Sequence, residues 1–296
     1  MRTVGILYPG EMGSAVARLL TAHGVQTATC AEGRSARTRS LAQSGGVALL
    51  PSIDDVVARA DVVISLVSPS GAVEVAKVFA AAVRRTGRCP TFLDANSVSP
   101  TTVGQVQDLA NAVGCECVDG AFVGGAAALG ATTTLVLSGA QAAHAGSMLE
   151  PCFRVRILSP SVGDASAFKL SFAGFNKGLV ALYLEAIGVA QRIGCRPVLE
   201  ESLREFYPGT VKTIERLLPS YPRHAARRAE EMGELRVWMA NLGEGGWMAA
   251  GTQAVLEEFA TLEIPLDTEG TLARLIEEYC LRRARRGRSG ADAGSQ

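Results

Sequence analysis

The spacing of hydrophobic positions along this 296-residue chain changes once, near Pro160. Before that point, short apolar runs alternate with alanine-rich segments in which apolar residues recur every three to four positions. Runs of the first kind predict strands, and segments of the second kind predict helices. The clearest strand-like runs are TVGILY, QTATC, DVVISLV, PTFLDA, CECVDG, TTTLVLSG and FRVRILSP. Their alternation with helices predicts βαβ units and a parallel sheet covered on both faces.

After Pro160 only helical patterns follow. The first is long, over residues 163–193, and its apolar side chains keep helical spacing. Proline and glycine clusters separate the later helices, which we predict over residues 200–218, 223–242, 246–262 and 268–283.

These patterns together predict an α/β fold with two domains. A Rossmann-type parallel-sheet domain, residues 1–160, is joined by a long interdomain helix to an all-helical domain, residues 161–284. The remaining residues, 285–296, are rich in Arg, Gly and Ser and predict a disordered tail. We expect a ligand in the crevice between the two domains.

The segment VGILYPGEMGSAVARLL, residues 4–20, has the form of a strand, a tight turn and a helix. Two of the three glycines of a dinucleotide-binding G-x-G-x-x-G turn are present, as Gly10 and Gly13. The first would let pyrophosphate approach the backbone, and the second would let the helix pack closely on the strand. The segment therefore predicts a nucleotide site, with a structural turn that binds nothing as the alternative.

Tyr8 stands where the first glycine of that fingerprint belongs. Pro9 follows it, and a residue before proline favours an extended conformation, so the pair can still form a turn. The helix then begins near Glu11 and Met12 and offers free N–H groups to a phosphate.

The end of the second strand reads CAEGRSARTRS, residues 30–40. An acid at this place binds the ribose 2′-OH of NAD, whereas a cation accommodates the 2′-phosphate of NADP. Here Gly33 is followed by Arg34 and Ser35, a cation and a hydroxyl. Glu32 is the competing acid, but it precedes the glycine and can point to solvent. The sequence therefore predicts NADP(H) as the cofactor.

Charge and hydropathy narrow the range of partners. Lys+Arg and Asp+Glu both number 29, so no overall field attracts nucleic acid or an anionic membrane. The N-terminal apolar run lacks a basic region before it, and no run approaches the roughly 20 apolar residues of a membrane span. We expect a cytoplasmic protein that binds a small molecule, and neither nucleic acid nor a membrane.

The metal-binding residue types show no ligand spacing. The chain has seven scattered cysteines and three histidines far apart. We therefore predict no metal site, and we expect the cysteines to be reduced, mostly buried thiols.

Several segments, in order, resemble the β-hydroxyacid dehydrogenase family, which includes 3-hydroxyisobutyrate and 6-phosphogluconate dehydrogenases and, more distantly, imine reductases. YPGEMG is similar to the family's G-x-G-x-M-G turn, and GRS is similar to the N-R-S/T element of its NADP users. SLVSPSGAV and DANSVSP resemble the turns after its fourth and fifth strands. The resemblance covers nearly all of residues 3–195. The C-terminal helices look more like a divergent branch of phosphogluconate-dehydrogenase-like proteins of unassigned substrate.

The resemblance implies further contacts near the nicotinamide. Cofactor contacts are expected from the residues after the fourth and fifth strands, namely Val67, Ser68, Pro69 and Asn96. Ser97 is expected to contact substrate. A structural role for Ser97 or Ser99, as the cap of the following helix, is the alternative.

The family's catalytic lysine lies early in the long interdomain helix, in the pattern G-x-G-x-x-x-K. GDASAFK places Lys169 there, with Asp164 between the glycine positions and Ala165 in place of the second glycine. The resemblance implies that Lys169 hydrogen-bonds a reacting carbonyl and exchanges a proton while hydride moves to or from nicotinamide. The alternative is a lysine that extends from an apolar helix to solvent.

Two departures from the family concern the substrate. The Asn four residues after the lysine is Ala173 here, and Asn176 lies seven residues on, about 10 Å along the helix. The loop DGAFVGG, residues 119–125, is similar to D-A-P-V-S-G-G, but Val123 replaces the serine that binds a carboxylate. Both changes argue against an ordinary small β-hydroxyacid. The substrate contacts that we expect from these segments are Phe122, Val123, Gly124, Gly125 and Asn176.

The leading hypothesis is an NADP(H)-dependent oxidoreductase for an alcohol/carbonyl pair, with Lys169 as acid/base. An NADPH-dependent imine reductase is the first alternative, although such enzymes usually lack the lysine. A non-catalytic NADP(H)-binding sensor is the second. Gly174 and Gly178, one turn apart, favour close helix packing, and family members commonly dimerise through this domain. We therefore expect a homodimer.

Overall fold

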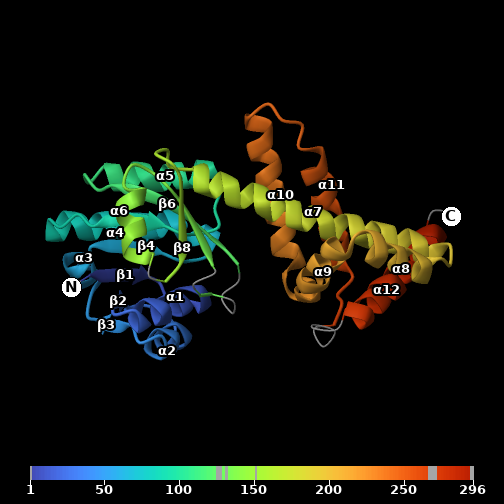
Figure 1. Ribbon diagram of the computed structural model, residues 1–296, viewed down its shortest axis with the longest axis horizontal. Coiled ribbons are helices and arrows are strands. Elements are labelled where there is room, and N and C mark those ends of the chain that lie inside the picture. The colour runs from blue at the N-terminus through green and yellow to red at the C-terminus, as the bar shows by residue number, and fades with distance from the viewer. Residues whose placement is uncertain (1, 125–128, 131–132, 151, 266–271, 294–296) are drawn as a thin grey trace. The chain divides into compact units, whose positions relative to one another are not determined.

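The structure is a computed structural model that describes residues 2–124, 129–130, 133–150, 152–265 and 272–293. The chain forms two compact units, residues 1–170 and 171–296, shown in Figure 1. The predicted architecture of a sheet unit followed by a helical unit is confirmed. The division falls within the long helix, later in the chain than the boundary expected at residue 160.

Unit 1 is built on an eight-stranded sheet with the order β3-β2-β1-β4-β5-β6-β7-β8. Neighbouring strands are parallel except β6 and β7, which are antiparallel. The strand order reverses direction at β1 and β4, so their carboxyl ends flank the point where doubly wound sheets bind ligands. The strands are β1 (Thr3–Leu7), β2 (Gln26–Cys30), β3 (Ala48–Leu50), β4 (Val62–Ser65), β5 (Thr91–Asp94), β6 (Cys117–Val123), β7 (Thr134–Ser138) and β8 (Arg154–Ser159).

Helices cover both faces of this sheet, as the sequence pattern predicts. Val16 of α1 and Met148 of α6 pack in one apolar core with alternate strand residues such as Ile64. Phe79 of α4 and Val103 of α5 belong to a second core on the other face. The helices of this unit are α1 (Glu11–Ala22), α2 (Ala36–Ser44), α3 (Ile53–Arg59), the 3₁₀ turn η1 (Pro69–Gly71), α4 (Ala72–Thr86), α5 (Pro100–Asn111) and α6 (Ala142–Leu149).

Three short elements escaped the sequence pattern: β3, α2 and α3. β3 has only three residues, and the signals of the two helices are local caps rather than long periodic runs. Ser35 caps α2 by accepting from the Thr38 N–H, and Ser52 with Asp55 forms a capping box at the start of α3.

Unit 2 is entirely helical in the part of the chain that the structure describes. It contains most of the long helix α7 (Asp164–Arg192), then α8 (Arg196–Phe206), α9 (Pro208–Leu217), the 3₁₀ turn η3 (Leu218–Ser220), α10 (Tyr221–Asn241), α11 (Trp247–Thr261) and α12 (Leu272–Ala293). The single helix predicted over residues 200–218 is two helices, because Pro208 lacks an N–H and begins a new one. Aromatic side chains form the centre of unit 2. The centroid of the Phe259 ring lies 6.1 Å from that of Tyr221 and 5.7 Å from that of Tyr279.

The chain end differs from the expectation of a disordered tail from residue 285. The last helix, α12, runs to Ala293. Arginine has a high helix propensity, so an Arg-rich segment continues a helix more readily than its polarity suggests.

By length and composition, α7 is the one described helix that could cross a membrane. Of its most apolar window, 44% is buried inside the protein. A core helix of a soluble protein passes the same test, so this helix is weak evidence for a membrane span.

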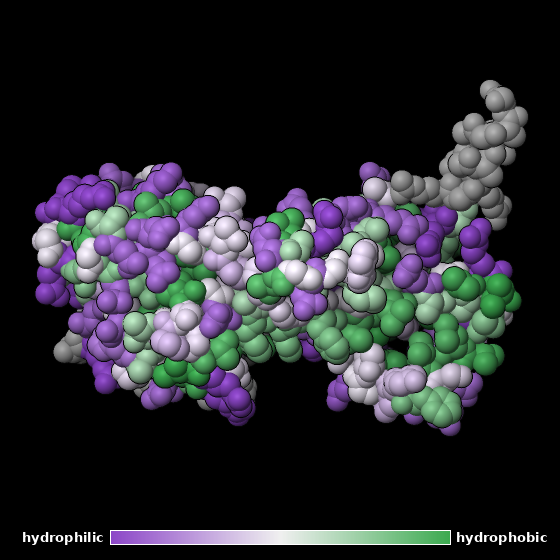
Figure 2. Space-filling view, turned by 90° about the horizontal axis from the view of Figure 1, so that it is seen from above, coloured by the Kyte–Doolittle hydropathy of each residue, from purple (hydrophilic) through white to green (hydrophobic). Residues whose placement is uncertain are grey.

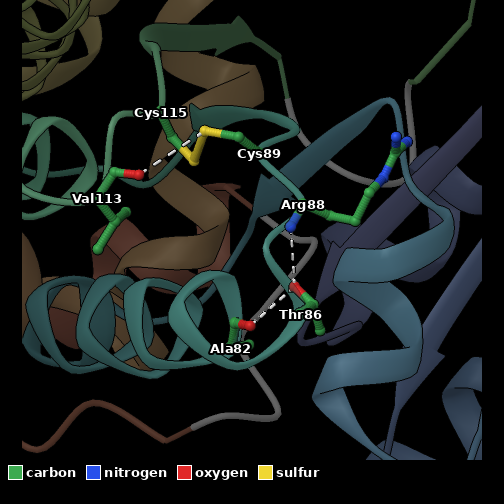
Figure 3. Close-up of a disulfide and its surroundings, with 6 residues drawn as sticks. All are labelled: Ala82, Thr86, Arg88, Cys89, Val113 and Cys115. Carbon is green, nitrogen blue, oxygen red and sulfur yellow. Dashed lines mark hydrogen bonds between the residues drawn. A yellow bond between two sulfur atoms is a disulfide. The ribbon is translucent and has the colours of Figure 1, made fainter.

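The cysteines correct one expectation. Cys89 and Cys115 form a disulfide, shown in Figure 3, with Cα atoms 5.3 Å apart. They precede the neighbouring strands β5 and β6, so strand pairing brings the two loops together. The expectation of reduced thiols is therefore wrong for this pair. Five described cysteines are free, and four of them are buried.

Candidate functional site

The turn between β1 and α1 has the two properties expected of a nucleotide turn. Gly10 is the N-cap of α1, and the first intrahelical bond runs from the Ser14 N–H to the Gly10 carbonyl at 2.9 Å. The preceding N–H groups of the helix are thus directed out of its end. A Cβ on Gly10 would meet nothing within 4 Å, whereas one on Gly13 would lie 3.4 Å from Ile6. Gly10 therefore keeps space open, and Gly13 permits close helix–strand packing.

A cavity of about 510 Å³ opens at this turn, a volume within the usual range of small-ligand sites. It lies between the N-terminal end of α1 and the turn that leads from β4 to α4. The predicted cofactor residues that line it are Tyr8, Gly10, Glu11, Met12, Arg34, Val67 and Ser68. The structure thus brings segments from three βα units to one cavity.

Arg34 reaches this cavity from the end of β2. Gly33 adopts a left-handed conformation, φ +67°, and the Arg34 N–H donates to the Ala31 carbonyl at 3.1 Å, which forms a tight turn. The guanidinium carbon then lies 3.6 Å from the centroid of the Tyr8 ring. Ser35 has a structural role as the cap of α2, and Glu32 is exposed.

A second arginine, Arg37, is paired with Glu11, which lines the cavity. Arg37 of α2 donates to the carboxylate of Glu11 at 2.6 Å, and both side chains are mostly exposed. Glu11 would otherwise place an unpaired negative charge beside the helix end that attracts anions. The ion pair reduces that repulsion toward a phosphate.

Asn96 is buried behind the cavity, although the sequence suggests a direct cofactor contact. Its Nδ2 donates to Ser65 Oγ at 2.9 Å, and its Oδ1 accepts from the Val67 N–H at 2.6 Å. These bonds join the end of β5 to the turn after β4. Asn96 therefore shapes the segment that presents Ser68 and Pro69 at the start of η1.

The structure gives different roles to Ser97 and Ser99, the two serines that follow Asn96. Ser99 is the N-cap of α5, and its Oγ accepts from the Thr102 N–H at 3.3 Å. Ser97 is half-buried and precedes that cap. The capping role therefore belongs to Ser99.

The loop after β6 contributes less than the sequence suggests. Phe122 points into the core and packs edge-on against Phe153, with centroids 5.2 Å apart, so its side chain is not placed to contact a substrate. Val123 packs partly on a small buried cluster, and Gly124 is exposed with φ +133°. Gly125 lies outside the described residues.

Lys169 lies on the first part of α7, within unit 1, and is half-buried. Ala165 and Ser166, four and three residues earlier, are buried, and Ala165 packs on Ala121 of β6. Residues at this spacing share one helix face, so Lys169 follows the face that packs on the sheet. Asn176 lies seven residues further along α7, in unit 2, and is half-buried.

Sequence reasoning missed a row of buried polar side chains that crosses four neighbouring strands, β4, β5, β6 and β7. Strand pairing places Ser65, Asp94, Asp119 and Ser138 next to one another, and each is at most 1% exposed. Strand alternation puts Asp94 on the same face as Phe92, which packs beneath α4 and α5. The signal was available, because the apolar runs PTFLDA and CECVDG each contain an Asp, Asp94 and Asp119.

Burial governs the charge of the two acids in this row. Burial raises the pKa of Asp94 to about 6, with hydrogen bonds from Asn96 and the charge of Lys169 opposing that rise. Burial also raises the pKa of Asp119, although Ser166, Gly163 and Ser138 all donate to its carboxylate. Acids with perturbed pKa values beside a lysine are typical of functional sites.

Within the described part of the chain, no three His, Cys, Asp or Glu side chains gather as metal ligands do. The buried Asp94 and Asp119 are only two, and the latter is already committed to hydrogen bonds.

Residues 3–155, more than half of the chain, match the family described as the NAD binding domain of 6-phosphogluconate dehydrogenase. This chain belongs to that family. Residues 190–259 match a second domain family, DUF1932, of unknown function. The resemblance to β-hydroxyacid dehydrogenases predicted from the motifs is therefore confirmed.

Two relatives of this 6-phosphogluconate dehydrogenase-like chain have no assigned function. An uncharacterised 28.5 kDa protein from the 7S RNA 5′ region of Methanothermus fervidus is 28% identical over 236 residues, which cover 78% of this chain and 88% of that protein. The conserved protein MTH1747, of unknown function and structurally similar to 3-hydroxyacid dehydrogenases, is 29% identical. It has a TM-score of 0.73 over 88% of this chain and 98% of its own.

The fold itself extends to characterised enzymes. The 3-hydroxyisobutyrate dehydrogenase of Mycobacterium tuberculosis has a TM-score of 0.75 and 21% identity, over 94% of this chain and 98% of that one. Solved imine reductases share the fold at lower identity. The family match and the cavity together identify a dehydrogenase-like oxidoreductase fold with a nicotinamide-dinucleotide-binding domain.

Proposed function

We propose that this protein is an NADP(H)-dependent oxidoreductase that transfers hydride between nicotinamide and a small alcohol/carbonyl substrate. The observation that carries the proposal is the arrangement at the carboxyl edge of the sheet in unit 1. There, the open end of α1, Arg34 and Lys169 supply a phosphate site, a cation and a proton-exchanging group.

The preference for NADP over NAD rests on Arg34. Its guanidinium lies over the Tyr8 ring, a contact that does not use its N–H donors. A planar guanidinium can donate two parallel hydrogen bonds to a phosphate. The exposed Glu32 would have to turn inward to bind a ribose hydroxyl instead.

Lys169 is assigned the role of acid/base. Bound NADPH would supply the hydride to the carbonyl carbon. The Lys169 ammonium would donate a proton to the carbonyl oxygen as negative charge develops there, and the amine would take it back from the alcohol in the reverse direction. Val123 offers an apolar contact in place of a carboxylate-binding serine, which favours a substrate without that anchor.

The first experiment is a titration with NADPH and with NADH, followed by nicotinamide fluorescence. Arg34→Ala should weaken NADPH binding about 10- to 100-fold, the usual effect of losing hydrogen bonds to a charged group, and should leave NADH binding nearly unchanged. Arg84→Ala, at the far end of α4, is the matched control. If wild-type protein binds neither nucleotide, the oxidoreductase proposal fails.

The second experiment measures NADPH consumption with a panel of aldehydes and ketones. Lys169→Met should abolish turnover while NADPH binding persists. Tight NADPH binding without turnover of any carbonyl, imine or alcohol would instead support a non-catalytic sensor.

An imine reductase is the alternative that one observation favours. The loop residue Val123 packs on an apolar cluster and cannot bind a carboxylate, so the loop suits a substrate without one. Cyclic imines and ketones compared side by side separate the two activities. Lys169→Met should harm imine reduction less, because a protonated imine already carries its proton.

We also propose a homodimer formed through unit 2. Phe175, Leu182 and Val189 lie seven residues apart on α7 and are 66%, 59% and 58% exposed. Figure 2 shows hydrophobic surface gathered over the helical part of the molecule. A seven-residue apolar repeat is the pattern by which one helix packs against another, and a second copy presents the same repeat.

We propose that the protein is cytoplasmic and that its partner is a small molecule, because the dehydrogenase-like fold is that of soluble enzymes. We propose that it binds neither nucleic acid nor a membrane. Flotation with anionic vesicles and a DNA mobility assay, both at physiological salt, should show no binding.

A further inference from the structure

Asp94 stands out in the buried row because half of its carboxylate has no partner. Its Oδ1 accepts from the Asn96 N–H at 2.8 Å. Its Oδ2 is buried and has no hydrogen-bond partner among the described residues. A buried acceptor left unsatisfied costs about 1–3 kcal/mol, so a native protein that keeps one has a use for it.

Asp119, the neighbour of Asp94 in the strand register, is fully engaged. It accepts from the Gly163 and Ser166 N–H groups at 3.1 and 2.8 Å, and from Ser166 Oγ at 2.7 Å. Ser138 Oγ donates to it as well, at 3.3 Å, and accepts from the Ala165 N–H. Asp119 and Ser138 thus cap the first turn of α7 from outside the helix.

This cap fixes the position of Lys169 relative to the row. Lys169 follows Ser166 by three residues, which is about 4.5 Å along the helix axis and on the same face. Because Ser166 is tied directly to Asp119, Lys169 starts one turn away from the paired acids. The charge of Lys169 is accordingly felt at Asp94, where it favours the ionised carboxylate.

The other groups that face Asp94 cannot supply a positive charge to its carboxylate. Asp119 on β6 is a second acid and repels a negative charge on Asp94. Cys117, on the same strand, is a neutral thiol, because burial raises its pKa, with Asp94 and Asp119 adding to the effect. Ser65 on β4 already accepts from Asn96. The charge of Lys169, by contrast, favours the ionised form of Asp94.

We propose that Asp94 is a positioning residue for the reaction, the buried counter-charge that draws the Lys169 ammonium to the carboxyl edge and keeps it protonated. The inference deepens the proposed function, since it concerns the group assigned there as acid/base. Asp94 acts through Lys169 and needs no contact with substrate. Asn96 ties the same carboxylate to the turn after β4, so one residue connects the cofactor side of the edge to the lysine.

The direct test is a titration of Lys169 that requires no turnover. The chain has only four lysines, Lys77, Lys169, Lys177 and Lys212, so reductive ¹³C-methylation gives few NMR signals. Lys169→Arg assigns the signal of interest. In Asp94→Asn the Lys169 signal should titrate at lower pH than in wild type, because the ammonium has lost a nearby negative charge. Asp108→Asn, an exposed acid on α5, is the matched control and should leave the signal in place.

A reciprocal measurement covers the case in which Asp94→Asn does not fold. Coupling between two sites acts equally in both directions. In Lys169→Met, a change at a half-buried position, the carboxyl carbon of ¹³C-labelled Asp94 should titrate at higher pH than in wild type. An unchanged Lys169 titration in Asp94→Asn, or an unchanged Asp94 titration in Lys169→Met, overturns the proposal.

These outcomes are independent of the proposed activity. A coupled Asp94–Lys169 pair in a protein whose turnover survives Lys169→Met would contradict the acid/base assignment alone. Turnover that depends on Lys169 without any coupling to Asp94 would contradict the counter-charge alone. Where turnover is measurable, the high-pH loss of carbonyl reduction should also begin at lower pH in Asp94→Asn.

Discussion

The guanidinium of Arg34 stacks on the ring of Tyr8, with 3.6 Å between its central carbon and the ring centroid. Tyr8 occupies the place of the first glycine in a dinucleotide turn, so the residue that departs from the fingerprint holds the cation that would bind the 2′-phosphate. The departure therefore changes how the site is built without closing it, since the cavity remains at this turn.

Replacing Tyr8 tests this relationship. Tyr8→Gly restores the fingerprint but removes the platform beneath Arg34, and an exposed cation–π contact is worth about 0.5–1 kcal/mol. NADPH binding should weaken about two- to fivefold while NADH binding does not. Tyr8→Phe keeps the ring and should bind NADPH as wild type does. Fluorescence titration measures all three, and tighter NADPH binding by Tyr8→Gly would contradict the role of the ring.

Gly10→Ala separates binding from stability. The added methyl would project into open space, and the backbone of Gly10, at φ −80°, suits alanine. The melting temperature should therefore stay constant or rise slightly, whereas nucleotide binding should weaken at least tenfold because pyrophosphate can no longer approach. Gly104→Ala, which also meets open space, serves as the control and should leave binding intact. Equal nucleotide affinity in Gly10→Ala and wild type would place the phosphate elsewhere.

Asp94 should make the stability of the fold depend on pH. Its pKa, raised by burial to about 6, exceeds the ordinary value of about 3.9. Between these values the native state keeps a proton that the unfolded chain has lost, so the free energy of unfolding falls as the pH rises from about 4 to 6 and then stays level. Asp94→Asn should be more stable than wild type by up to about 3 kcal/mol at pH 7 and not at pH 4. Urea unfolding at the two pH values measures this, and the same difference at both would rule out titration as its cause.

Unit 2 contains a buried ion pair, Lys177 Nζ to Glu231 at 2.7 Å, with side chains 9% and 19% exposed. Burial alone would raise the pKa of Glu231, but Lys177 and the nearby arginines outweigh it and hold the pKa below its ordinary value. Glu231→Gln should cost about 2–3 kcal/mol, because it leaves Lys177 without its counter-charge. The contribution of the pair is present above the ordinary carboxyl pKa and is lost as the pH falls below it.

Glu74→Gln is the control for this prediction. It removes the exposed Lys77–Glu74 pair at 3.3 Å and should change the unfolding free energy by less than about 1 kcal/mol. If both substitutions cost the same, the burial of Lys177 does not determine the energy.

The exposed repeat on α7 should control assembly. Leu182→Asp introduces a charge into the centre of the repeat and should convert a dimer to a monomer, as measured by light scattering at micromolar concentration. Ile157→Asp, a similarly exposed position on β8, should leave the mass unchanged. A monomeric wild type would contradict the proposed dimer outright.

The sequence predicted the layers of this fold because its long elements carry strong periodic signals. The seven strand-like runs correspond to seven of the eight strands, and the order of the first βα units follows from the alternation. The antiparallel pairing of β6 and β7 could not be predicted in this way. The pattern of hydrophobic positions within a strand does not depend on whether the neighbouring strand is parallel or antiparallel. The short α2 and α3 depend on single caps, which a pattern of hydrophobic positions does not register.

The candidate site could be predicted only for residues whose role follows from their own position in the sequence. Arg34 and the glycines could be placed by their offset from a strand end, and the structure brings Arg34 and Gly10 to one cavity. Phe122 could not be separated from a substrate contact, since the face that a strand residue presents depends on register. Asp94 and Asp119 could not be recognised as a pair of neighbouring acids, because only the pairing of β5 with β6 places them next to each other.

The disulfide between Cys89 and Cys115 closes a covalent ring around β5 and α5, the segment that contains both Asp94 and Asn96. A ring of this size removes about 3–4 kcal/mol worth of conformational freedom from the unfolded chain. The two cysteines precede their strands and so lie at the amino edge of the sheet, whereas the cavity lies at the carboxyl edge. Reduction of the disulfide would therefore lower the stability of the fold through the amino edge of the sheet, whereas a ligand bound in the cavity would raise it through the carboxyl edge.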